Sequence, residues 1–187
     1  MIAAPGVQQM TLRLNENKQG SKLGKKVPVY YLVKAGSDER SFSSYWCPYM
    51  KNQARSVMIG NESNTMFTAE MDGCSLGVGS VTPTGHRRVT HINQASYWGQ
   101  LANNGAMSEA DAKMAQYDSQ NMLLQDQLGQ SVNIIGPRKY RRDVDGAFVL
   151  KSTTFGVLTG IGWDFYVQTF YSPDLIKYYL RDVKKVS

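Results

Sequence analysis

The sequence contains few of the residues from which metal and redox sites are built. Two cysteines and two histidines occur in 187 residues, with no Cys-x-x-Cys and no His-x-x-x-His pair. Zinc is usually held by such pairs, so no zinc site is expected. The glycines between Gly73 and Gly79 also lack the Lys-Ser/Thr of a phosphate-binding loop and the order of a dinucleotide-binding turn. The sequence therefore predicts neither a metal ion nor a cofactor.

Long hydrophobic runs are missing as well. No stretch of about 18 apolar residues is present, so no membrane-spanning helix is predicted. The first residues have neither the basic region nor the apolar region of a secretory signal, and any export is expected to use another route. Without that signal, we expect the two cysteines to be reduced rather than joined in a disulfide.

The composition is that of an ordinary globular protein. Hydrophobic residues make up 42% and charged residues 19%, which predicts one domain over residues 1–187 with a flexible tail at residues 1–9. The net charge of +6 is consistent with an acidic partner surface or simply with solubility. Basic residues are scattered apart from the cluster at 138–142 and Lys184-Lys185, without an aromatic-basic recognition motif. Nucleic acid is therefore not the expected partner, and a monomer is expected.

Most of the chain has the pattern of β-strands. Residues rich in β-branched and aromatic side chains predict strands over 10–14, 27–33, 65–70, 87–93 and 132–135, and a hairpin of 147–158 with 161–171. A helix is predicted over 108–128, because Ser108 is a good N-cap, Asp111 occupies the capping-box position and Gly129 ends the pattern. Met114, Tyr117, Leu124 and Leu128 would form its apolar face.

The C-terminal segment predicts a second helix. Ser172 would be its N-cap, Pro173 its first residue and Asp174 an acid in its first turn. The expected fold class is α+β: a strand-rich, β-sandwich-like core with one long helix and a C-terminal helix packed against it.

Cys74 is the candidate nucleophile. It follows Gly73 after a predicted strand, and His91 lies on the next predicted strand, which would bring a base beside the thiol. The backbone N–H groups of Gly73, Cys74 and Ser75 could bind a developing oxyanion. Cys47, surrounded by aromatic residues, is expected to be packed and inert.

Two features complicate this assignment. His86 lies twelve positions after Cys74 and competes with His91 as the base, although its place in a turn beside two arginines favours His91. Asp72 stands two positions before the thiol and would oppose thiolate formation if it is close in space. The sequence offers no compensating charge except a protonated His91.

The spacing of three residues resembles the Thr/Cys/His pattern of the bacterial protein-glutamine deamidases. Thr68 stands six positions before Cys74, and His91 seventeen positions after it. This family includes the chemotaxis receptor deamidase CheD, the catalytic domain of cytotoxic necrotizing factor and Burkholderia lethal factor. The resemblance covers residues 67–93. It implies a cysteine-dependent hydrolase that converts a glutamine of a target protein to glutamate, with Thr68 orienting His91 or shaping the site.

The resemblance also implies a biological setting. A bacterial effector or toxin, secreted or injected and active in the host cytosol, is expected, or else a housekeeping enzyme of the chemotaxis type. Two other functions stay open at this point. The same pair of residues could serve a transglutaminase or a thiol protease, and a non-enzymatic binding module would keep Cys74 as a structural residue.

Overall fold

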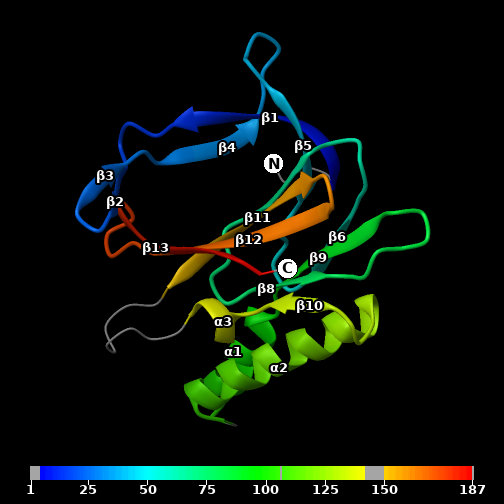
Figure 1. The fold of residues 1–187 in the computed structure, drawn as a ribbon. Helices are drawn as coiled ribbons and strands as arrows, with labels where there is room; N and C mark the ends of the chain where they lie inside the picture. The colour runs from blue at the N-terminus through cyan, green and yellow to red at the C-terminus, as the bar shows by residue number, and fades with distance from the viewer. Residues whose placement is uncertain (1–4, 106, 142–149, 187) are drawn as a thin grey trace.

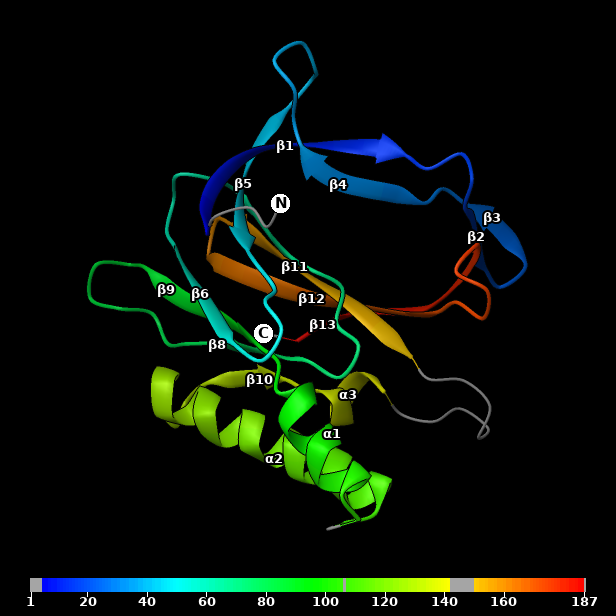
Figure 2. The ribbon, with the colours of Figure 1, turned by 180° about the vertical axis from the view of Figure 1, so that it is seen from behind.

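The protein consists of two β-sheets, with helices on the outer face of the smaller sheet (Figure 1). The computed structural model describes residues 5–105, 107–141 and 150–186. Seen from behind, the two long helices again lie beyond the smaller sheet, on the side away from the larger one (Figure 2). The layers are therefore large sheet, small sheet and helices.

The large sheet contains nine strands and is strongly curved (Figure 1). Its strand order is β3-β2-β13-β12-β11-β7-β5-β1-β4. Its strands are β1 (Gly6–Leu14), β2 (Gln19–Lys22), β3 (Lys25–Val27), β4 (Tyr30–Lys34), β5 (Phe42–Cys47), β7 (Thr65–Thr68), β11 (Lys151–Thr159), β12 (Gly162–Tyr171) and β13 (Lys177–Lys185). The β5–β7 and β13–β2 pairs are parallel, and the other pairs are antiparallel.

The small sheet contains four antiparallel strands in the order β10-β8-β9-β6. They are β6 (Ala54–Ile59), β8 (Ser75–Val78), β9 (Arg87–Ile92) and β10 (Asn133–Ile135), and the helices are α1 (Ala95–Asn103), α2 (Glu109–Leu128) and α3 (Pro137–Tyr140). Helix α2 packs directly on β8 at Gly77, where a β-carbon would lie 2.7 Å from Leu128 and 2.8 Å from Leu124. A glycine is needed there for this close approach.

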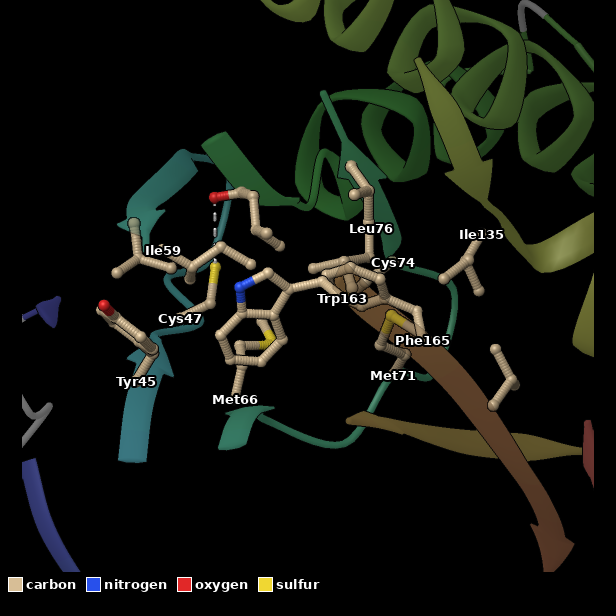
Figure 3. Packing of buried hydrophobic residues seen from close by; sticks show 14 of the residues in the cluster. Tyr45, Cys47, Ile59, Met66, Met71, Cys74, Leu76, Ile135, Trp163 and Phe165 are labelled. Carbon is tan, nitrogen blue, oxygen red and sulfur yellow. Dashed lines mark hydrogen bonds between the residues drawn. The ribbon is translucent and has the colours of Figure 1, made fainter. Parts of the chain in front are cut away.

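The main core fills the space between the two sheets (Figure 3). Trp163 and Phe165 of β12 and Met66 of β7 meet Leu76 and other apolar side chains of the small sheet. The Trp163 Nε1–H donates to the Gly60 carbonyl at 3.0 Å, which satisfies the one polar atom of this large side chain. The packing fixes how the strands of the two sheets face each other.

The predicted fold is wrong at its C-terminal end. No C-terminal helix is present in residues 172–186; the chain forms β13, which pairs with β12. Asp174 Oδ1 accepts the N–H groups of Ile176 and Lys177 at 2.9 and 2.7 Å, so it closes a turn. An aspartate that accepts backbone N–H groups is found both at the start of a helix and in a turn, so this pattern does not distinguish the two. The aromatic residues that follow the turn favour a strand.

Other elements differ more locally from the expectation. Helix α2 occupies the stretch where residues 108–128 are predicted helical, and Ser108 Oγ accepts the Asp111 N–H. Met114, however, is 43% exposed, because the buried face of α2 carries Gln116 and Gln120. Residues 6–9, predicted to belong to a flexible tail, are part of β1. Helix α1, which has no side-chain cap, was not predicted. None of the described helices is long and apolar enough to cross a membrane.

Candidate functional site

Three chain segments carry the candidate residues to the region between the sheets, where Thr68 and His91 are hydrogen-bonded but Cys74 and His91 are not. Cys74 stands just before β8, His91 lies on β9, and Thr68 ends β7 of the large sheet. Ser75 pairs with Ile92, so the antiparallel register places Cys74 opposite Asn93. His91 lies on the same face as Asn93, diagonal to Cys74, at a spacing that longer side chains bridge. All three candidates are buried, with 3% (Cys74), 1% (His91) and 6% (Thr68) of their surface exposed.

The turn before Cys74 requires a glycine and is held from the helical side. Gly73 has φ +90°, in the left-handed region that favours glycine. Its N–H donates to the Tyr140 hydroxyl at 3.0 Å, and this hydroxyl donates to the Cys74 carbonyl at 2.8 Å. The Gly73 carbonyl accepts the side-chain amides of Gln116 and Gln120 at 3.2 and 3.1 Å. These three side chains therefore position the thiol.

That network changes the predicted oxyanion site. The Gly73 N–H already donates to Tyr140, so it is occupied in this state. The Ser75 hydroxyl donates to Gln120 Oε1 at 2.6 Å and so points towards α2. The Cys74 and Ser75 N–H groups remain the predicted backbone donors for an oxyanion.

The hydrogen bonds of Thr68 determine the protonation of His91. Thr68 Oγ1 lies 2.8 Å from the Cys47 carbonyl and 2.7 Å from His91 Nδ1. A hydroxyl has one proton and a carbonyl only accepts, so Thr68 donates to Cys47 and accepts from the Nδ1–H of His91. The other ring nitrogen, Nε2, then carries a lone pair. It is buried and has no hydrogen-bond partner among the described residues.

The imidazole is neutral at ordinary pH. Burial lowers the pKa of His91 to about 4, because the protonated ring would lose its hydration. The Tyr49 ring packs against it in an edge-to-face arrangement, with the ring centroids 5.5 Å apart. His91 is therefore a neutral ring that donates its Nδ1–H to Thr68 and has a lone pair on Nε2 to accept a proton.

Cys74 is a neutral thiol with polar groups around it. Asn93 Nδ2 donates to Sγ at 3.2 Å. Burial raises the pKa of Cys74, while the Asn93 amide and the Asp72 backbone N–H act in the opposite direction. The Asp72 carboxylate also raises it, but Arg141, 3.3 Å from that carboxylate, lowers it. Arg141 thus supplies the compensating charge that the sequence did not reveal.

The second cysteine is buried in the core next to Thr68. Cys47 is fully buried, and its Sγ donates to the backbone carbonyls of Arg55 and Val89 at 3.4 and 3.7 Å; Figure 3 shows it within the core. Burial raises its pKa to about 12. Both cysteines are free, and Cys47 is packed as its aromatic neighbours predicted.

His86 lies at the far end of β9. It lies seven positions before Asn93, the residue opposite Cys74, which corresponds to about 23 Å along a strand. Its Nδ1 lies 3.0 Å from the Thr84 carbonyl, and the ring packs on Gly60. Its position excludes His86 as the base for Cys74.

A cavity beside the large sheet does not include the thiol. It has a volume of about 480 Å³, lies against the large sheet, and includes Trp46, Phe67 and Phe155 in its wall. Thr68 borders it, but Cys74 and His91 do not. The described residues also contain no group of three His, Cys, Asp or Glu side chains that could hold a metal ion.

No protein-family model and no curated protein matches this chain. The resemblance to the glutamine deamidases therefore still depends on Thr68, Cys74 and His91 alone. The structure adds the Thr68–His91 hydrogen bond and the placement of His91 on the same face as Cys74.

Proposed function

We propose that the protein is a cysteine-dependent amidohydrolase that deamidates a glutamine of another protein. One observation carries this proposal: His91 Nε2 is an unprotonated, unpartnered nitrogen on the strand face that also carries Cys74. A buried acceptor without a donor lowers the stability of the folded protein, and a role in catalysis explains why such an acceptor is kept. Thr68 holds the ring from the opposite side, as a general base requires.

The first half of the reaction would make a thioester. His91 Nε2 accepts the Cys74 proton while Sγ forms a bond to the side-chain amide carbon of the substrate glutamine. The carbonyl oxygen becomes an oxyanion, which the Cys74 N–H would bind. The tetrahedral intermediate then breaks its carbon–nitrogen bond, and His91 returns the proton to the leaving ammonia.

The second half would hydrolyse the thioester. A water molecule loses its proton to His91 Nε2 and attacks the acyl carbon, and the carbon–sulfur bond breaks. The sulfur recovers the proton from His91, and the product is a glutamate side chain. Each step uses only this chain, the substrate and water.

Proteome-wide mass spectrometry for glutamine-to-glutamate conversion tests the proposal. Host-cell extract is incubated with the wild-type protein and with Cys74→Ser, His91→Gln and His86→Gln variants. Conversion at defined glutamines that disappears with Cys74→Ser and His91→Gln, but persists with His86→Gln, is expected. Amine incorporation at the same glutamines would indicate a transglutaminase, and peptide cleavage a thiol protease. A host regulatory protein as substrate, and so an effector or toxin role, is part of this proposal.

A binding module with a structural Cys74 is the second candidate, and the burial of the thiol favours it. With 3% of its surface exposed, Cys74 packs among Met71, Leu76 and Ile135 (Figure 3). Cys74→Ala would then lower the free energy of unfolding by about 1–3 kcal/mol. Because the site is buried, both functions predict this loss. The choice therefore rests on His91→Gln, which removes conversion only if the protein is an enzyme.

A further inference from the structure

Asn93 directly contacts the candidate nucleophile. It follows the last residue of β9, opposite Cys74 across the strand pair, and 4% of its surface is exposed. Its Nδ2 lies 3.2 Å from Cys74 Sγ. Among the described residues, no other side chain donates a hydrogen bond to this sulfur.

The orientation of the Asn93 amide is fixed by the backbone around it. Its Oδ1 accepts the N–H of Asn52 at 3.4 Å and the N–H of Ala95 at 3.3 Å. Exchanging the amide oxygen and nitrogen would place NH₂ against two N–H donors, so Nδ2 must face the sulfur. Asn52 has φ +57°, a left-handed conformation that asparagine tolerates more readily than most residues. The donor is therefore in place before any substrate binds.

We propose that Asn93 is a further catalytic residue, whose side-chain N–H stabilises negative charge on Cys74 Sγ as the thiol proton leaves. The catalytic part of this inference rests on the proposed function, in which Cys74 is the nucleophile. Hydrogen bonds to a charged sulfur are stronger than those to a neutral thiol, so the contact favours the charged form. The stabilised charge is the one that forms during attack on the amide carbon.

Several other charged or titratable groups surround this sulfur. Asp72 and Arg141 approach from the segments before β8 and after α3, and their charges act in opposite directions. Burial raises the pKa values of Tyr49 and Tyr140, and a nearby Cys74 thiolate raises them further. His91, on β9, is neutral in the resting protein and becomes charged only when it takes the thiol proton.

The test compares Asn93→Asp and Asn93→Ala with Asn61→Asp. A carboxylate at position 93 still accepts the N–H groups of Asn52 and Ala95, but it has no N–H for the sulfur. Asn61 is exposed beyond β6, at the opposite end of the small sheet, and its replacement adds the same charge far from Cys74. Asn93→Ala removes the donor without adding a charge. If only one of the two Asn93 variants folds, that variant alone is enough to test the inference.

The measured quantity is the pH dependence of the Cys74 β-carbon NMR shift, with Cys47 as an internal reference. We expect Asn93→Ala to raise the apparent pKa of Cys74 by about one unit, which is a tenfold smaller thiolate fraction at a given pH. Asn93→Asp should raise it further, and Asn61→Asp should leave it unchanged. An unchanged pKa in a folded Asn93 variant, or an equal shift in Asn61→Asp, would overturn the inference. No glutamine substrate is needed, so this result is independent of whether deamidation is found.

Discussion

Replacing Thr68 with valine tests the link between the two sheets. Valine has nearly the same shape but no hydroxyl, so the Nδ1–H of His91 loses its acceptor inside the core. A buried donor without a partner costs about 1–3 kcal/mol. With a urea dependence of about 2 kcal/mol per M, the midpoint of unfolding should fall by roughly 0.5–1.5 M. The proton should also redistribute to Nε2, because the ring no longer has one favoured tautomer.

Urea unfolding followed by fluorescence measures the first effect, and imidazole nitrogen NMR shifts measure the second. The wild type should have its proton on Nδ1 of His91, and Thr68→Val should have a mixed population. Thr68→Ser, which keeps the hydroxyl, should retain the wild-type tautomer. If deamidation is found, Thr68→Val should lower kcat by about 10²–10⁴, as expected when a general base is impaired. A wild-type ring protonated on Nε2, or an unchanged tautomer in Thr68→Val, would refute the reasoning.

Two further results are expected. Acidification from pH 6.5 towards 4 should destabilise the protein by about 3 kcal/mol, because the unfolded chain takes up a proton that buried His91 resists; above pH 6.5 this contribution is constant. Urea titrations at several pH values measure this effect: the free energy of unfolding should depend less steeply on pH in His91→Gln than in the wild type, whereas His86→Gln should keep the wild-type pH dependence. Tyr49→Ala should speed alkylation of Cys74 by iodoacetamide, because its ring covers His91 beside the thiol, while Cys47 stays unreactive. Equal rates of Cys74 alkylation in the wild type and in Tyr49→Ala would show that Tyr49 does not limit access to the thiol.

The sequence predicted that Cys74 and His91 lie close together but not by which strands: the strand predicted before Cys74 is β7 of the large sheet, and the strand that pairs with β9 is β8, which begins after Cys74. Two adjacent strands with a turn between them form an antiparallel pair, and the two-residue period puts the side chains on one face. The contribution of Asn93 follows from the same register but needs the exact pairing of Ser75 with Ile92. A one-residue slip would have turned Asn93 to the opposite face. Sequence pattern alone does not determine that register.

The side chains that hold the turn before Cys74 could not be predicted from the sequence, because they come from distant segments of the chain. Gln116, Gln120 and Tyr140 are 42 to 67 positions from Gly73 and Cys74, yet they bind the turn between them. Two glutamines on a helix normally indicate its exposed face. Here they are buried because the left-handed Gly73 turns its carbonyl towards α2. The only signal available was their i, i+4 spacing on the helix.

Burial determines the order of events that the proposed chemistry would follow. It raises the pKa of Cys74 and lowers that of His91 to about 4, so a resting thiolate–imidazolium pair is disfavoured at both partners. Proton transfer must then accompany attack, which confines the reactive sulfur to the time when an amide carbon lies against it. A permanently charged, exposed thiolate would react with any electrophile that reached it. A neutral buried pair reacts only with a group held in position, and selecting one glutamine in a folded protein requires that restraint.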